Sequence, residues 1–81
     1  MIKAVVHVRL KPGVLDPEGK AIEHALAALG FDGIESVRRV KSFEVTLAET
    51  DRARAASTLD AMSRQLLANP VIEDYVIEQP D

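Results

Sequence analysis

The chain has 81 residues, enough for one small domain, so we expect a single domain over residues 1–81. It has no Cys, which excludes disulfides and thiolate metal sites. The net charge is -3 with acidic and basic residues interleaved, whereas a nucleic-acid-binding surface needs clustered Lys and Arg. No apolar run is long enough to span a bilayer, and the N-terminal segment lacks the apolar core of a signal peptide. We therefore expect a cytoplasmic protein that binds neither nucleic acid nor membrane.

Residues 2–10 alternate between apolar and mixed positions, which is typical of a half-buried strand. The apolar face consists of Ile2, Ala4, Val6, Val8 and Leu10. The mixed face consists of Lys3, Val5, His7 and Arg9.

The loop after this strand leads into a helix over residues 17–29. Asp16 is a good N-cap, and Pro17 suits the first helical position because no amide hydrogen is needed there. Gly30 follows at the position where helices often end with positive φ. The expected buried stripe of this helix is Ile22, Ala25, Leu26 and Leu29.

Two more strands are predicted next, over residues 34–40 and over the alternating residues 43–48, with a tight turn near Lys41 and Ser42. A second helix begins after Thr50 or Asp51 and runs to about Leu67. Its expected stripe is Ala55, Leu59, Met62 and Leu66. Asn69-Pro70 ends the helix, and residues 71–77 form a last strand.

The predicted order is β-α-β-β-α-β, which indicates an α+β, ferredoxin-like, two-layer fold. An antiparallel sheet would carry both helices on one face and leave the other face open. Residues 71–77 keep apolar side chains on the outward side in either orientation. Because an exposed apolar patch on a small domain usually marks an interface, we expect self-association through the sheet or its edge, as a dimer or a pair of dimers.

Few residues suggest catalysis. His7 and His24 lack any metal-binding spacing, and Glu73 and Asp74 point to opposite faces of a strand. Residues 11–13 lack the pattern of a phosphate-binding loop, and no nucleophile has a triad-like arrangement. A basic cluster of Arg38, Arg39 and Lys41 suits either a contact with an acidic partner or a solvated turn.

Two segments, Lys-Pro-Gly-Val-Leu-Asp-Pro-Glu-Gly-Lys at 11–20 and Leu-Leu-Ala-Asn-Pro-Val-Ile-Glu-Asp-Tyr at 66–75, resemble the PurS subunit family of phosphoribosylformylglycinamidine synthase. Leu-Gly-Phe at 29–31 and Val-Arg at 37–38 are also similar to the family. Val40 stands where the family often has Gly before the lysine that matches Lys41.

The resemblance implies a small non-catalytic subunit of a purine-biosynthesis ligase complex. Such a subunit bridges a glutaminase subunit and an ATP-dependent synthase subunit, so that ammonia passes between them. It implies that this chain binds no cofactor, and that the synthase partner uses ATP and Mg. Our candidate partner contacts are Lys11, Arg38, Lys41 and Tyr75.

Two other classes of function remain open. Ferredoxin-like dimers also serve as stand-alone modules that sense small molecules, which would require a polar pocket at the ends of helices or strands. A minor metal-dependent enzyme would require His7 and His24 to converge.

Overall fold

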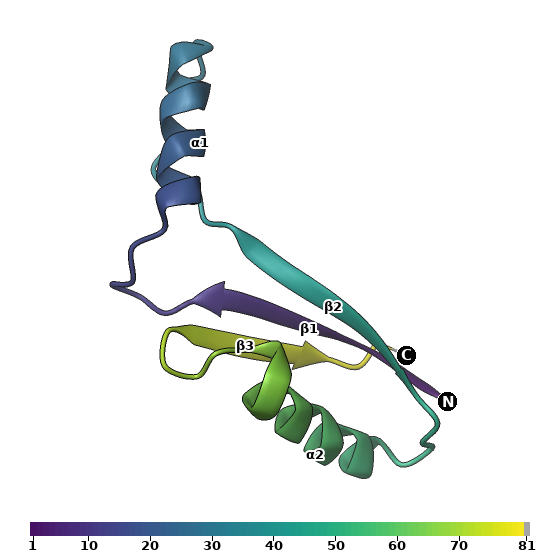
Figure 1. The fold of residues 1–81 in the computed structure, drawn as a ribbon. Helices are drawn as coiled ribbons and strands as arrows, with labels where there is room; N and C mark the ends of the chain where they lie inside the picture. Colours follow the sequence, from purple (N-terminus) through teal and green to yellow (C-terminus); the bar gives the residue numbers. More distant parts are fainter. Residues whose placement is uncertain (81) are drawn as a thin grey trace.

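The computed structural model describes residues 1–80 and contains three strands and two α-helices (Figure 1). The elements are β1 (Ile2–Leu10), α1 (Pro17–Ala28), β2 (Val40–Leu47), α2 (Arg52–Met62), a π-helical turn η1 (Ser63–Leu67) and β3 (Glu73–Glu78). The strands form one antiparallel sheet in the order β2-β1-β3. The α+β class and the antiparallel sheet are therefore confirmed, with the element order β-α-β-α-β.

The central strand β1 organises the core. Ala4, Val6 and Val8 are buried on its inner face, as the alternation predicted. In the register, Val8 lies opposite Lys41 of β2 and Tyr75 of β3, so these side chains share the inner face. Helix α2 covers that face and buries Ala55 and Leu59, whereas no helix of the described residues covers the opposite face of the sheet (Figure 1).

The strand predicted over residues 34–40 is wrong. Residues 31–39 form no strand and instead return along α1, where the Phe31 N–H donates to the Leu26 carbonyl oxygen. Consequently there is no hairpin turn at Lys41 and Ser42, which both lie inside β2. Val40 is the first residue of β2, where an extended backbone suits its β-branched side chain.

The prediction that both helices cover one face of the sheet is also wrong. Of the helices in residues 1–80, α2 alone lies on the sheet, and α1 projects away from it (Figure 1). The radius of gyration is 16.1 Å and the chain extends over 49 × 28 × 14 Å. A compact domain of this length has a radius of gyration of about 12 Å. We call the sheet with α2 the body, and α1 with residues 29–35 the arm.

Both predicted N-caps are confirmed. The Asp16 carboxylate accepts from the Gly19 N–H at 3.0 Å, with Pro17 in the first turn of α1. Asp51, rather than Thr50, caps α2 by accepting from the N–H groups of the second and third helical residues. Gly30 has φ +95, so the predicted left-handed exit from α1 is confirmed as well.

The C-terminal third departs from the prediction at its boundaries. The regular helix α2 ends at Met62, and η1 completes the segment to Leu67. The next strand begins at Glu73 rather than at residue 71, because Asn69 forms a turn there. Its carbonyl oxygen accepts from the N–H groups of Ile72 and Glu73 at 3.1 and 2.7 Å. No helix within residues 1–80 is long and apolar enough to cross a membrane.

Leu59 should be the most sensitive position in the body. Its side chain is fully buried, so Leu59→Ala should lower the free energy of unfolding by about 2–5 kcal/mol through the cavity it leaves. Leu66 was predicted to share the buried stripe, but it is 83% exposed, so Leu66→Ala is the matched control and should change little. Urea unfolding of both variants measures the difference, and equal losses would contradict the assigned core.

Gly30→Val should cost on the order of 1–2 kcal/mol, because a β-branched residue is strained at φ +95. Apart from the adjacent residues, no atom lies within 4 Å of an added Cβ, so the loss would come from the backbone conformation alone. Ala27→Val is the control, since it places the same side chain at an ordinary helical position of α1. A melting temperature that falls no further for Gly30→Val than for the control would contradict the assigned helix end.

Candidate subunit interface

The arm joins the body at a narrow connection that we call the neck, residues 11–16 and 36–39. Here the Asp16 carboxylate accepts two backbone hydrogen bonds, one from Gly19 at 3.0 Å and one from Arg39 at 3.1 Å. These two N–H donors, helped by the nearby Arg38 and Arg39 guanidinium groups, hold the pKa of Asp16 below its usual value of 3.8. One carboxylate therefore ties the start of α1 to the residue just before β2.

Gly19 is buried and lets the first turn of α1 approach residues 36–39 closely. A Cβ at this position would lie far inside van der Waals contact with the Val37 carbonyl oxygen, and 2.8 Å from Asp16 Oδ2. A larger residue would therefore separate α1 from residues 36–39. A glycine in the first turn of a helix with a good N-cap is the sequence signal from which this contact could have been predicted.

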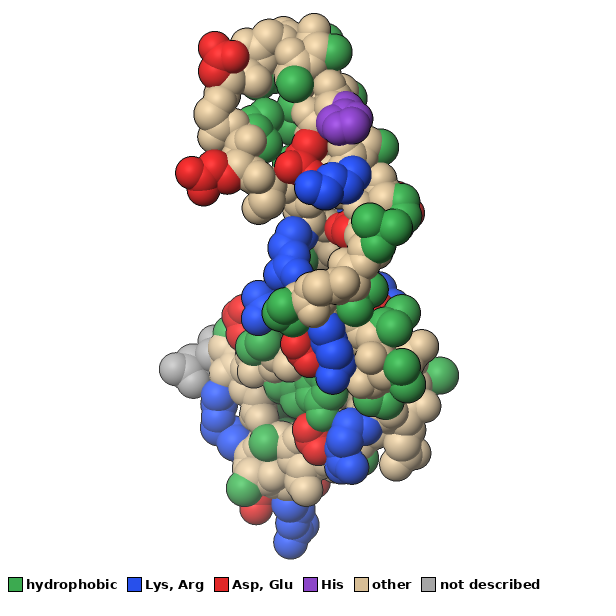
Figure 2. All heavy atoms as spheres, turned by 90° about the vertical axis from the view of Figure 1, so that its left-hand side faces the viewer, with side chains coloured by type: hydrophobic (Ala, Val, Ile, Leu, Met, Phe, Trp, Pro, Cys, Tyr) green, Lys and Arg blue, Asp and Glu red, His purple; other side chains and the backbone are tan. Residues whose placement is uncertain are grey.

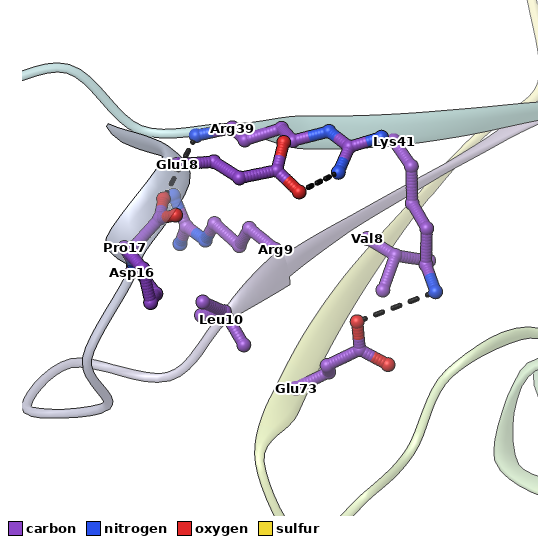
Figure 3. Close-up of a pocket in the computed structure, with 9 residues that line it drawn as sticks. All are labelled: Val8, Arg9, Leu10, Asp16, Pro17, Glu18, Arg39, Lys41 and Glu73. Carbon is purple, nitrogen blue, oxygen red and sulfur yellow. Dashed lines mark hydrogen bonds and ion pairs between the residues drawn. The ribbon is translucent and has the colours of Figure 1, made fainter. Parts of the chain in front are cut away.

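Beside the neck lies a cavity of about 560 Å³ whose lining is drawn in Figure 3. Its charged side chains are mostly paired with one another. Arg39 Nη1 lies 2.6 Å from Glu18 Oε1, and Lys41 Nζ lies 3.4 Å from Glu73 Oε2. Arg9 points toward Asp16 in the same view, but among residues 1–80 it forms no ion pair within 4.0 Å. With three acidic and three basic residues, the cavity favours neither an anion nor a cation.

The three basic residues proposed as partner contacts lie together at the neck end of the sheet. Lys11 Nζ is 3.7 Å from an Asp74 carboxylate oxygen, and Arg38 Nη2 donates to the Leu10 carbonyl oxygen at 3.4 Å. Lys41 pairs with Glu73 as described above and lies 5.9 Å from the centre of the Phe43 ring. Each residue thus has a partner within its own chain, although the side chains of Lys11 and Lys41 remain about half exposed.

Tyr75 lies on the inner face of the sheet, away from that basic group. Its hydroxyl donates to Asp60 Oδ1 of α2 at 2.5 Å, and Arg64 donates to the other carboxylate oxygen of Asp60 at 2.8 Å. The Tyr75 hydrogen bond is the main cause of a lowered pKa for Asp60, and the same bond raises the pKa of Tyr75. Tyr75 therefore fastens α2 to β3.

The two histidines do not converge. His7 lies on the open sheet face between Ser42 Oγ at 2.8 Å and Glu78 Oε1 at 2.7 Å. His24 lies on α1, in the arm. No group of three potential ligands that could hold a metal occurs within residues 1–80.

The arm exposes apolar side chains that a small domain normally buries. Leu29 is 74% exposed, Phe31 is 58% exposed, and Ile22 and Ile34 are about 40% exposed. Figure 2 shows hydrophobic side chains over the arm and lysine and arginine side chains where the arm meets the body. The stripe predicted to be buried against the sheet is therefore mostly uncovered, and only its Leu26 side is covered by the returning segment. This surface is the strongest candidate interface.

The family model for PurS, phosphoribosylformylglycinamidine (FGAM) synthase, matches residues 3–81. The chain belongs to the PurS family. The PurS subunit from Synechocystis is 49% identical over 73 residues, which cover 90% of this chain and 73% of that protein. A solved structure of Bacillus subtilis PurS matches with a TM-score of 0.88 and 41% identity over the full length of both chains. A chain in the structure of PurLQS from Thermotoga maritima matches with a TM-score of 0.89 and 26% identity, covering 98% of this chain and 96% of that one.

The family supplies one subunit of FGAM synthase, a ligase of purine biosynthesis, so the resemblance found in the sequence is confirmed. The similarity extends over both body and arm, because it includes all elements from β1 to β3. The projecting arm is therefore part of the fold that this chain shares with solved PurS structures.

Tyr75→Phe should destabilise the body in a pH-dependent manner. The bond from Tyr75 stabilises ionised Asp60, so its effect is fully present above the ordinary Asp pKa of 3.8 and is lost as the pH falls through the lowered value. Toward high pH it is lost as the pH rises through the raised pKa of Tyr75. Urea midpoints of parent and variant should therefore differ most near neutral pH and converge in acid.

The same comparison in an Asp60→Asn background is the control. There the ionisable acceptor is gone, so the Tyr75→Phe difference should lose its acid dependence. A difference that is constant from neutral to acid pH in both backgrounds would contradict the role given to this hydrogen bond.

Proposed function

We propose that this chain is a non-catalytic bridge in FGAM synthase. It would hold a glutaminase subunit and an ATP-dependent synthase subunit together, so that ammonia released from glutamine reaches the synthase site. The observation that carries this proposal is the match, over 98% of this chain, to a chain in the structure of PurLQS from Thermotoga maritima. The basic residues at the neck end of the sheet, Lys11, Arg38 and Lys41, are the candidate contacts with the catalytic subunits. ATP and Mg would be bound by the synthase partner, in the cytoplasm.

Reconstitution of the complex tests this role. The glutaminase and synthase subunits are assayed with and without this chain, supplied either with glutamine or with ammonia. Glutamine-dependent formation of the amidine product should require the chain, whereas ammonia-dependent formation should not. Equal glutamine-dependent rates with and without the chain would overturn the bridging role.

Charge reversal tests the candidate contacts at the neck end of the sheet. Lys11→Glu, Arg38→Glu and Lys41→Glu should weaken binding to the catalytic subunits more than they lower stability, because exposed ion pairs contribute only about 0–1 kcal/mol to folding. Lys3→Glu, at the far end of β1, is the control with the same change of charge. Variants that bind as the parent does would remove these residues from the interface.

We also propose that the chain acts as a homodimer in which each arm lies on the body of the other copy. Within the body, α2 packs on β1 and β3, so the inner face of β2 is the least covered part of the sheet. That face presents Phe43 and Val45, which are only partly buried. In the predicted two-layer fold a second helix would cover this surface. Helix α1 of the other copy can take that place, because it carries an exposed apolar stripe.

This exchange of arms between two copies explains the extended shape of the single chain. Projection of the arm into water is unfavourable, because burial of apolar surface contributes about 25 cal/mol of stabilising free energy per Å². A second copy related by two-fold symmetry would cover both arms and both β2 surfaces at once. A dimer joined this way through the sheet could pair further into a tetramer through the open sheet faces.

Ile22→Glu should convert the dimer to a monomer, because it places a charge in the apolar stripe of the arm. Ala27→Glu is the matched control, since Ala27 lies on the opposite side of α1 and should leave the dimer intact. Sedimentation equilibrium at micromolar concentration distinguishes the two states. A parent chain that is already monomeric would overturn the proposed dimer.

A further inference from the structure

The neck holds the arm away from the body even though the chain is long enough for the arm to fold back. Eleven residues, 29–39, connect the end of α1 to β2, and an extended segment of that length spans up to about 36 Å. Helix α1 has 12 residues and is about 18 Å long. The extended length of the connection is therefore roughly twice the length of the helix that it runs back along. Specific contacts, rather than chain length, fix the direction of the arm.

Those contacts converge on the first turn of α1. Asp16 accepts from the backbone of Gly19 within the helix and from the backbone of Arg39 in the returning segment. The Arg39 guanidinium then pairs with Glu18, which also belongs to the first turn. Two hydrogen bonds thus join Arg39, just before β2, to the start of α1, and the third bond holds Asp16 to the first turn of the helix. A helix held at its base in this way cannot tilt without breaking at least one of them.

Gly19 adds a steric requirement to these hydrogen bonds. The returning segment passes so close to α1 that the Val37 carbonyl oxygen occupies the space of a Cβ at this position. In an ordinary exposed helix, Gly→Ala is stabilising, because alanine has the higher helix propensity. At Gly19 the same change has to push Val37 and Asp16 aside.

We propose that the Asp16–Gly19–Arg39 contact sets the direction of the arm, and so makes α1 available to a second copy rather than to its own sheet. The inference rests on the proposed dimer, because direction matters only if another copy receives the arm. Asp16 and Gly19 act as positioning residues, since neither has to touch the second copy.

Distance measurements test the positioning directly. Because the chain has no Cys, Ala28→Cys and Thr46→Cys place spin labels at only two sites, the end of α1 and the far end of β2. The labelled chain is mixed with an excess of unlabelled chain, so that pulsed EPR reports only the distance within one chain. The parent should give one narrow distance distribution, and Asp16→Asn and Gly19→Ala should broaden or shift it.

Asp51→Asn is the matched control. It makes the same change in the N-cap of α2, where the carboxylate holds N–H groups of its own helix only. Asp16→Asn keeps an oxygen for the cap but presents an amide donor to the Arg39 N–H, so it removes the link and not the cap. The distance distribution of Asp51→Asn should match that of the parent.

The dimer dissociation constant should follow the distances. We expect Asp16→Asn and Gly19→Ala to raise it on the order of tenfold, and Asp51→Asn to leave it unchanged. If the parent is a dimer and both neck variants keep its distances and its dissociation constant, the positioning role is wrong while the dimer stands. If the parent is a monomer, the dimer and this role fail together, and the bridging test with glutamine and ammonia is unaffected.

Discussion

The hydrogen bonds accepted by the Asp16 carboxylate are the constraint on which the shape of this chain depends. They join the first turn of α1 to the last residue before β2, so the arm leaves the body at a fixed base. The two N–H donors, helped by the nearby guanidinium groups, lower the pKa of Asp16, and hydrogen bonds to an ionised carboxylate are stronger than those to a neutral group. The long axis of 49 Å and the uncovered apolar side of α1 both follow from this connection.

The body is built on a simpler basis. The inner face of β1 provides three buried side chains, and α2 contributes Ala55 and Leu59 to close the core. Tyr75 and Asp60 then fix α2 against β3 through one short hydrogen bond. A core this small gives limited stability, and small domains of this size commonly gain more by associating. The body and the arm therefore have complementary surfaces, and the arm of one copy can cover the body of another.

The sequence predicted those features that depend on neighbouring residues. The alternation of residues 2–10 and the caps at Asp16 and Gly30 need only local information, and all three are confirmed. The prediction of a strand over residues 34–40 is wrong because this segment contacts the start of α1 instead of a neighbouring strand. Arg39 binds a carboxylate 23 residues away, a contact that neither periodicity nor propensity encodes. Gly19 carried a signal for this close approach, but a single glycine in a helix has several explanations.

The candidate interface was predicted in part. The resemblance of residues 11–20 and 66–75 identified the family, and the comparisons confirm it. Lys11, Arg38 and Lys41 are predicted to contact partner subunits, and each also has a partner within its own chain. The apolar stripe of α1 was found but assigned to the core, because a periodic pattern shows that a face is buried and not by which chain.

The central claim is that the arm of one copy lies on the body of another, and isotope-filtered NMR tests it most directly. A sample is made by mixing carbon-13-labelled chain with unlabelled chain, so that cross-peaks between labelled and unlabelled protons arise only between copies. The account predicts cross-peaks from the Ile22 methyl groups of one copy to the Phe43 ring of the other. Cross-peaks between these residues within a single copy, or none at all in a dimeric sample, would contradict it.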